Sequence, residues 1–298
     1  MKKIKQRLKQ RYKQFQKHPI TKGNELTALM RYMFFHFMIR TRKKMIYSWI
    51  GDLKFIAKKG EAGIVGNIYY GLFEFEESIF LIHLLNNQDT FLDIGANVGH
   101  YSLLMSGLKQ AKSIAIEPVP KTYSLLKQQI ELNNLNHLID AKNVGVSNTN
   151  GELYFSTDRG TMDRIVNSSY SSSVVVKVQT LDSLVCNNIP LAIKMDVEGY
   201  EKYALQGAKN ILNNKDLKVI VLELNNSGKR YNISDEEVYQ IVYDYGFRPF
   251  IYNPKERTFN RLPTYNKDTF NTIFIRDLDF IKNRVRMSKK INIKNKNY

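Results

Sequence analysis

The sequence predicts an α/β fold: a doubly wound, Rossmann-like, mostly parallel sheet of seven strands with an antiparallel terminal strand, preceded by an N-terminal helical extension. Two observations support this fold. Residues 90–101 run from an apolar strand through a turn with two glycines into a helical pattern, and buried strands alternate with helices after it. In such a sheet a ligand lies beyond the carboxyl ends of the strands, where glycine permits close approach. Residues 90–101 therefore predict the entrance of a nucleotide-type site.

Composition divides the chain into a central domain with basic ends. The 298 residues carry a net charge of +17, and 43% of them are apolar. Residues 1–60 carry 17 Lys and Arg against two acids, and residues 281–298 carry seven and no acid. We expect a basic helical extension (1–60), a domain (61–280) and a basic tail (281–298). Such ends suit an anionic membrane, a phosphorylated carrier or nucleic acid, or are simply solvated.

Cysteine usage and hydropathy favour a cytoplasmic location. The lone Cys186 excludes an internal disulfide and agrees with a reducing compartment. The first 23 residues lack the apolar core of a secretory signal, and the stretch 26–39 is too short to span a bilayer. No spacing of histidines and acids predicts a structural zinc site.

Residues 26–39 nevertheless show a helical apolar pattern. The recurring residues are Leu26, Met30, Met33, Phe34 and Phe37. We interpret them as the face of an amphipathic helix packed on the domain; the alternative is a helix lying on a membrane surface.

The chain then reads as a short strand at 53–57, an aromatic loop at 68–73 and an amphipathic helix at 74–85. After the glycine turn we expect a strand at 112–118, a helix at 120–133 and a strand at 137–144.

Residues 146–178 read as a hairpin, whose polar loop 157–173 contacts substrate or is disordered; we favour the first. A buried strand at 191–196 leads into one helix that reaches Asn213, and a strand follows at 218–224. The helix 234–245 starts with a capping box, and the segments 247–252 and 271–276 form an antiparallel terminal pair.

Two acids at neighbouring strand ends indicate the ligand. Glu117 ends the second strand, 24 positions after Asp93, where such folds hold ribose hydroxyls. An acid at the first strand tip and Asn97 in the turn argue against a pyrophosphate, whereas the cationic S-adenosylmethionine fits. We expect both acids to face one cavity; the alternative is a purely structural turn.

A second group of charged residues follows the strand at 191–196. Its members are Lys194, Asp196, Glu198 and Glu201, with Glu223 on a neighbouring tip. Asp196 or Glu198 could take a proton from a substrate hydroxyl or bind a divalent ion, which no other feature indicates. The structural alternative is a Lys194–Asp196 ion pair, with Glu198 capping the next helix. His100 could act as a base or simply start its helix.

Four ordered motifs resemble the FkbM-type methyltransferases. They are residues 93–102 (DIGANVGHYS), Glu117-Pro118, Thr180-Leu181-Asp182 and residues 194–201 (KMDVEGYE). The resemblance implies a class I enzyme that uses S-adenosylmethionine, in a family whose described members mostly methylate hydroxyls on sugars or polyketides.

The resemblance also implies roles for individual residues. The turn residues Asp93, Gly95, Ala96, Asn97 and Gly99 would surround the methionine part of the cofactor. Glu117 would bind the ribose, Asn143 would lie by the adenine, and Asp196 would face the methyl group. Glu74 matches an acid that the family often carries, whereas Tyr200 replaces a small residue and would narrow the acceptor pocket.

These observations lead to three hypotheses. The first is an O-methyltransferase acting on a glycan or glycolipid hydroxyl, with Asp196, Glu198, Lys194 and His100 as catalytic candidates. The second, motivated by the basic ends, is an RNA methyltransferase, although no clear base-stacking surface accompanies them. The third is a non-catalytic cofactor-fold module that docks on a membrane or carrier.

Overall fold

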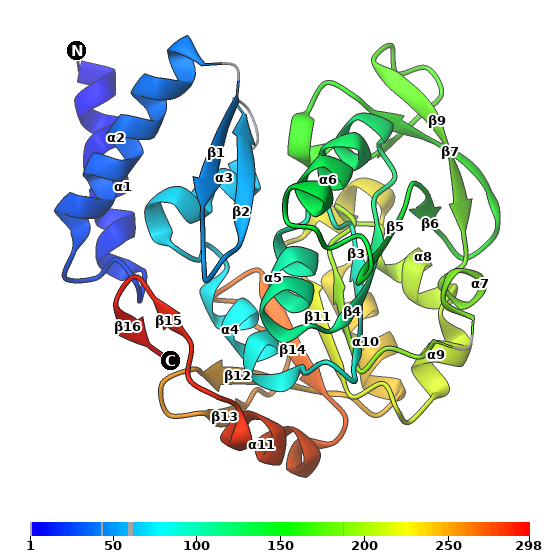
Figure 1. Cartoon of the computed structure of the whole chain (residues 1–298). Coiled ribbons are helices and arrows are strands. Elements are labelled where there is room, and N and C mark those ends of the chain that lie inside the picture. Colours follow the sequence, from blue (N-terminus) through cyan, green and yellow to red (C-terminus); the bar gives the residue numbers. More distant parts are fainter. Residues whose placement is uncertain (1, 43, 59–61, 187) are drawn as a thin grey trace.

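A computed structural model describes residues 2–42, 44–58, 62–186 and 188–298, and it shows a three-layer α/β domain with an N-terminal helical addition (Figure 1). The predicted boundary between residues 60 and 61 falls outside the described residues. The main sheet has the strand order β13-β12-β14-β11-β10-β3-β4-β5. Its strands are β3 (Thr90–Ile94), β4 (Lys112–Ile116), β5 (Ile139–Lys142), β10 (Ala192–Met195), β11 (Val219–Glu223), β12 (Arg248–Asn253), β13 (Thr258–Arg261) and β14 (Asn271–Ile275).

The sheet confirms the doubly wound prediction. Strands β5, β4, β3, β10 and β11 are mutually parallel, and β14 pairs antiparallel with both β11 and β12. The sheet has one strand more than the seven expected, because β13 pairs antiparallel with β12 at the edge. That strand carries one large apolar residue, Phe259, so its sequence has little strand character.

Helices cover both faces of this sheet, and a separate apolar core lies on each side. One core contains residues of α4 (Phe75–Leu84), α5 (His100–Lys109) and α6 (Pro120–Leu132). The other contains residues of α7 (Leu181–Val185), α8 (Glu201–Gln206), α9 (Lys209–Asn213) and α10 (Asp235–Asp244). Successive side chains of β3 point to opposite faces of the sheet. Phe91 therefore belongs to the first core and Leu92 to the second.

The one helix expected up to Asn213 is instead two, α8 and α9. The break lies at Gly207, where an added Cβ would come within 2.2 Å of the carbonyl oxygen of Ser147. The close backbone contact, which no local pattern encodes, interrupts the helix. The capping box of α10 is confirmed: Ser234 Oγ accepts from the Glu237 N–H, and Glu237 accepts from the Ser234 N–H.

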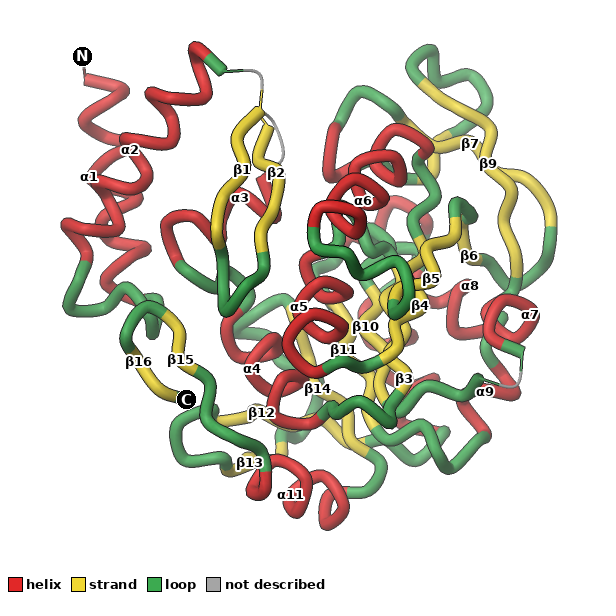
Figure 2. The backbone as a smooth tube through the Cα atoms, in the orientation of Figure 1, coloured by secondary structure: helices red, strands yellow, loops and turns green. Residues whose placement is uncertain are grey.

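The N-terminal part forms a helical hairpin beside the main domain, seen at the left of Figures 1 and 2. It consists of α1 (Lys2–Lys17) and α2 (Glu25–Thr41), followed by the antiparallel strands β1 (Lys44–Ser48) and β2 (Lys54–Lys58). The aromatic loop expected at 68–73 is wrong in its first half, because residues 68–70 end the helix α3 (Ala62–Tyr70). The chain turns only at Gly71, where φ is +90°.

The C-terminal segment is structured too. It forms α11 (Leu278–Met287) and a small hairpin of β15 (Asn292–Ile293) and β16 (Lys296–Asn297), which lies near the first helices (Figure 1). None of the helices in the described part of the chain has the length and apolar character needed to cross a membrane.

The predicted hairpin between 146 and 178 belongs to a second, four-stranded sheet of order β6-β9-β7-β8. Its strands are β6 (Gly145–Val146), β7 (Gly151–Ser156), β8 (Ile165–Val166) and β9 (Ser173–Gln179). Strands β7 and β9 pair antiparallel, as expected. The polar loop between them is ordered by the short 3-10 helix η1 (Gly160–Met162) and by β8.

Candidate active site

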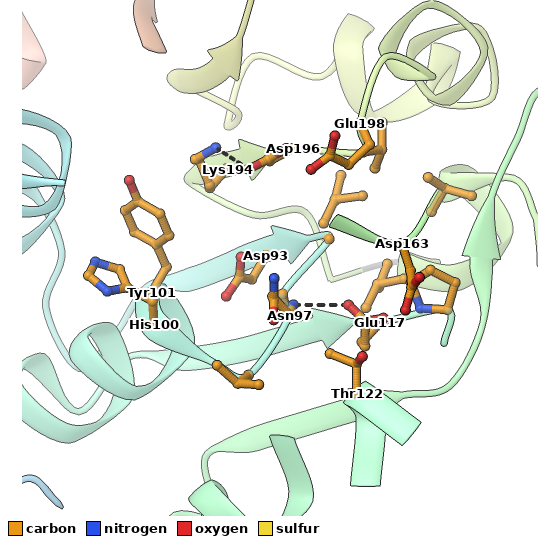
Figure 3. A pocket seen from close by; sticks show the side chains of 18 of the residues that line it. Asp93, Asn97, His100, Tyr101, Glu117, Thr122, Asp163, Lys194, Asp196 and Glu198 are labelled. Atoms are coloured by element: carbon orange, nitrogen blue, oxygen red, sulfur yellow. Dashed lines mark hydrogen bonds and ion pairs between the residues drawn. The ribbon is translucent and has the colours of Figure 1, made fainter. Parts of the chain in front are cut away.

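A pocket opens at the carboxyl ends of β3, β4 and β10, and Figure 3 shows it from close by. Ten of the twelve predicted site residues line it; they are Glu74, Asp93, Gly95, Ala96, Asn97, His100, Glu117, Lys194, Asp196 and Glu198. Gly99 and Asn143 are not among its lining residues. The cavity expected to lie between Asp93 and Glu117 is therefore present.

Gly95 is the first residue of the turn that follows β3. Its φ is +76°, a conformation that residues with a side chain rarely adopt, and an added Cβ would lie 1.8 Å from the carbonyl oxygen of Asp196. The turn after β3 is thus pressed against the tip of β10. Gly99, with φ of +93°, is the N-cap residue of α5 and packs on Leu126. It therefore shapes the turn and does not form part of the pocket wall.

Asp93 is buried and fixes the start of α5. Its Oδ2 accepts hydrogen bonds from the backbone N–H and the hydroxyl of Ser102. Burial raises the pKa of Asp93 to about 6. Asp93 therefore lines the pocket and also holds the strand, the turn and the helix in register.

Glu117 reaches across to the same turn. Its Oε2 accepts from the Asn97 N–H at 3.0 Å (Figure 3), and its Oε1 accepts from the Val119 N–H at 2.9 Å. Each oxygen has a further lone pair that can accept from a ligand hydroxyl. Burial, offset in part by these two backbone donors, raises the pKa of Glu117 to about 7.

Lys194 and Asp196 form the opposite wall of the pocket. Their side chains make an ion pair with Nζ 3.8 Å from Oδ2, as the structural alternative expected (Figure 3). Lys194 is buried, and within the described residues its Nζ has no hydrogen-bond partner. Although burial acts to lower it, the carboxylates of Asp196 and Glu74 hold the pKa of Lys194 above its ordinary value. A buried cation with unused donors at a pocket wall is a group that a ligand oxygen can satisfy.

Glu74 also lines the pocket and accepts a hydrogen bond from the hydroxyl of Tyr101. Burial raises the pKa of Glu74, and the charge of Lys194 opposes that effect. Glu77, three residues further along the chain, is buried. Burial, together with the carboxyl of Glu74, raises the pKa of Glu77 to about 8. Glu77 does not stand out as a site residue in the sequence, because it lies in an apolar helix whose neighbours a local pattern does not show.

Glu198 does not cap the following helix, as the structural alternative supposed. It has φ of +56° and lies 4.0 Å from Arg230 Nη1. Glu201 has the structural role instead, since its Oε1 accepts from the N–H groups of Val197 and Gly199. The turn after β10 is held by Glu201, which leaves the Glu198 side chain at the pocket.

Glu223, on the neighbouring tip of β11, extends this acidic group without lining the pocket. Burial and the adjacent Asp196 carboxyl raise its pKa. The raised pKa of Glu223 reduces the negative charge at this wall.

His100 lines the pocket, but both of its ring nitrogens have protein partners. Nδ1 lies 3.0 Å from Asn67 Nδ2, and Nε2 lies 3.0 Å from Ser78 Oγ. The other end of that amide, Asn67 Oδ1, accepts from the Phe73 N–H, which fixes its orientation. Nδ1 therefore accepts, and Nε2 donates to Ser78. Burial lowers the pKa of His100 to about 3, so the ring is neutral and poorly suited to take a proton.

Asn143 lies behind the tip of β4. Its Nδ2 donates to the carbonyl oxygens of Glu117 and Pro118, both at 2.9 Å. It shapes the chain after Glu117, and its predicted place beside an adenine stays a prediction.

The second sheet and its polar loop supply pocket residues that the sequence did not single out: Phe155, Gly160, Asp163 and Ile165. The polar loop between β7 and β9 was the available signal, because it had little to bury. Tyr200, predicted to narrow the pocket, is also a lining residue. No group of three or more His, Cys, Asp or Glu arranged to hold a metal ion occurs among the described residues.

A comparison with protein-family models assigns the central part of the chain to a known family. The model of the methyltransferase FkbM domain matches residues 93–249, just over half of the chain. The hexuronic acid methyltransferase AglP of Haloferax volcanii is 24% identical over 143 residues. That match covers 47% of this chain and 58% of AglP, so the chain spans less than two thirds of this relative.

Two solved structures resemble the chain over larger shares. Methyltransferase FkbM from Methylobacillus flagellatus KT has a TM-score of 0.43 and 13% identity, covering 84% of this chain and 60% of that one. TYW2 of P. horikoshii, in complex with MeSAdo, has a TM-score of 0.40 and 14% identity, covering 79% of this chain and 72% of that one.

Proposed function

The chain belongs to the FkbM methyltransferase family, and on this premise we propose that it transfers a methyl group from S-adenosylmethionine to a sugar hydroxyl of a glycan, a glycolipid or a related metabolite. One observation carries the proposal: Asp93 and Glu117, on the tips of adjacent parallel strands, line one pocket beside the Gly95 turn. This is the place where open α/β sheets bind nucleoside ligands.

The charge of the pocket fits a cationic cofactor. The described residues that line it include one lysine and six carboxyl groups. The carboxyl groups belong to Glu74, Asp93, Glu117, Asp163, Asp196 and Glu198. Such a site would repel a pyrophosphate, but it attracts a ligand with a sulfonium and an ammonium group. When bound, S-adenosylmethionine supplies the methyl group from its sulfonium.

The residues that would hold the cofactor follow from their positions. Glu117 would accept hydrogen bonds from the two ribose hydroxyls through lone pairs that its backbone donors leave over. Asp93, Ala96 and Asn97 would surround the methionine part, with Glu74 as a further acid for its ammonium group. Asn143 would act indirectly, by holding the chain at Pro118 beside the adenine.

On the acceptor side, Asp196 takes the proton of the attacking hydroxyl. Lys194 Nζ lies 3.8 Å from Asp196 Oδ2, and its unused donors can orient the hydroxyl oxygen. Glu198 would bind a second hydroxyl of the sugar at the edge of the site. His100 stays a catalytic prediction that its two hydrogen bonds argue against.

The same charge bears on the acceptor. AglP is a hexuronic acid methyltransferase, but the carboxyls of this pocket would repel a uronate. We therefore expect a neutral sugar to be the better acceptor. A panel of matched neutral and uronic oligosaccharides, assayed for methyl transfer from labelled S-adenosylmethionine, compares the two classes directly.

The cofactor assignment is tested by titration calorimetry with S-adenosylmethionine. We expect the intact protein to bind it, and Glu117→Gln and Asp93→Asn each to weaken binding by about tenfold or more, since each loses a charged partner. The exposed Glu131→Gln on α6 is the matched control and should leave affinity unchanged. Absence of binding by the intact protein, or equal loss in the control, would contradict the proposal.

The alternatives have different outcomes in the same assays. Salt-sensitive RNA binding together with methyl transfer to RNA would favour the RNA methyltransferase. Cofactor binding without transfer to any glycan pool would favour a non-catalytic module. The cytoplasmic location stays a prediction of the sequence.

A further inference from the structure

The outer face of α2 is apolar and uncovered. Its five large residues are Leu26, Met30, Met33, Phe34 and Phe37, with exposed fractions of 67%, 57%, 43%, 62% and 65%. We call these five the apolar stripe. The sequence interpretation placed them against the domain and is wrong, because α2 packs inward through Ala28, Phe35 and Ile39 instead. The helix thus has two apolar faces, and the protein itself covers only one.

The stripe is free of charge along its length. Between Leu26 and Ile39 the charged residue of α2 is Arg31, and it points inward, where its Nη2 donates to the carbonyl oxygen of Tyr69 at 2.8 Å. Burial lowers the pKa of His36, which keeps that ring neutral near neutral pH. Spaced at i, i+4, i+7, i+8 and i+11, the stripe runs about 17 Å along one side of the helix.

A cationic helix flanks the stripe. Helix α1 packs against α2 and contains lysines and arginines but no acid. Among residues 5–17 of this helix, the exposed cations are Lys5, Arg7, Lys9, Lys13 and Lys17.

Between the two helices lies a hollow lined by Arg7, Gln10, Arg11, Gln14 and Tyr32. The Arg11 guanidinium lies 5.4 Å from the centre of the Tyr32 ring, which holds it at this place. Two guanidinium groups with amide donors beside them have the chemistry that recognises a phosphate.

We propose that the α1–α2 hairpin docks on the surface of a bilayer that contains anionic phospholipids. The apolar stripe lies at the boundary of headgroups and acyl chains, and the Arg7–Arg11 hollow takes a lipid phosphate. An apolar face with an adjoining row of cations is the combination that binds a helix in the plane of an anionic interface.

Other occupants fit the charges less well. A second copy that docked through the same stripe would bring two α1 helices together, and their cations would repel each other. A folded partner needs a groove for a protruding row of Met, Phe and Leu side chains, together with acids for α1. An anionic bilayer meets both requirements at once, without any fixed shape. This inference does not depend on the proposed methyl transfer.

The experiment is sedimentation of the full chain with vesicles of phosphatidylcholine, with and without phosphatidylglycerol. We expect binding to the vesicles that contain phosphatidylglycerol, and a decrease as salt is raised. Phe37→Glu should weaken binding by at least about tenfold, because it puts a negative charge into the stripe. The matched control is Phe270→Glu, since Phe270 is also 65% exposed but lies in the loop before β14; it should bind as the wild type does.

A second pair of variants tests the contribution of the cations of α1. Arg7→Gln should weaken binding about fivefold, and the exposed Lys255→Gln, which removes the same charge elsewhere, should leave it unchanged. Thermal melting and circular dichroism establish that each variant is folded.

Three results would overturn the proposal. The first is no binding to phosphatidylglycerol vesicles at low salt. The second is an equal loss in Phe37→Glu and Phe270→Glu. The third is a dimer in ultracentrifugation without lipid that Phe37→Glu abolishes, which would assign the stripe to a second copy of the chain.

Discussion

The backbone of Gly95 passes so close to Asp196 that the residue has no substitute. Gly95→Ala would place a methyl carbon 1.8 Å from a carbonyl oxygen and would also strain a φ of +76°. We expect a loss of unfolding free energy of at least about 2 kcal/mol, because overpacking and a left-handed backbone both contribute. Denaturant unfolding measures the loss, and cofactor binding should fall with it because the turn and the tip of β10 separate.

The chain offers a matched glycine as control. Gly151 has no atom within 4 Å of an added Cβ, so Gly151→Ala should change stability by less than about 0.5 kcal/mol. If Gly95→Ala were as stable as Gly151→Ala, the close approach of the two strand tips would be refuted.

Two buried carboxyls give cofactor binding a pH dependence of known sign. Burial raises the pKa of Asp93 to about 6 and that of Glu117 to about 7, so both release a proton between mildly acidic and mildly alkaline pH. A cationic ligand favours the ionised forms, and its affinity therefore rises with pH. From pH about 6 to about 8 we expect the Kd of S-adenosylmethionine to fall about tenfold.

Calorimetry in buffers of different ionisation enthalpy would also detect protons released on binding. S-adenosylhomocysteine lacks the sulfonium charge, and we expect its affinity to depend less on pH. In Glu117→Gln the pH dependence should shrink to the part that belongs to Asp93. An affinity that falls as pH rises would show that the acids do not face the cofactor in their charged state.

At the scale of elements, one partly buried imidazole joins three helices. His100 starts α5, its Nδ1 accepts from Asn67 on α3, and its Nε2 donates to Ser78 on α4. Of these helices, α3 contributes Ile64 to the pocket wall, and α5 contributes His100 and Tyr101. The ring therefore connects α3 and α4 to the helix that follows the glycine turn.

This geometry predicts a structural role for His100. His100→Asn should lower unfolding free energy by about 1–3 kcal/mol, since it leaves buried partners unsatisfied. Among folded molecules kcat should change by less than about fivefold, whereas loss of a general base costs about a hundredfold or more. Ser78→Ala, which removes one of the same contacts but keeps the ring, is the companion variant. A hundredfold loss of kcat with unchanged stability in His100→Asn alone would restore the catalytic role.

For the whole molecule, the sequence predicts the parallel core and a cavity at the tips of β3 and β4, and the structure contains both. Strands such as β3 and β10 are short apolar runs with an acid at or just after the end, so both the strand and the tip residue are visible in the local pattern. The partners of those acids were not visible. Ser102 on Asp93, Asn67 on His100 and the loop around Asp163 depend on contacts that only the folded chain creates.

Helix α2 shows a second limit of pattern reading. Its apolar period correctly predicted a helix, but a period does not say which face the protein covers. Both Phe35 and Phe34 fit a helical stripe, and the structure buries the first and exposes the second. The pattern alone therefore favours packing of this face on the domain, with a membrane surface as the alternative.

The two ends of the chain, both basic, meet each other in the structure. Lys296 Nζ donates to the carbonyl oxygens of Pro19 and Lys22, at 2.9 and 3.0 Å, in the turn that joins α1 to α2. Tyr298 packs its ring on Phe75, with centroids 4.8 Å apart. The C-terminal hairpin therefore braces the turn of the N-terminal hairpin and links it to the start of α4.

This contact predicts a local effect for Lys296→Met. Loss of two hydrogen bonds to carbonyl oxygens should cost about 1–3 kcal/mol of local stability, and it should speed hydrogen exchange at the amides of Thr21, Lys22 and Asn24. Because Lys296 does not line the pocket, the affinity for S-adenosylmethionine should stay unchanged. The exposed Lys290→Met is the control with the same change of charge. Faster exchange spread evenly over the main sheet, or none at the turn, would mean that the ends of the chain do not support each other, and the α1–α2 hairpin would then rest on its contacts with α3 and with the chain at Phe73 and Phe75.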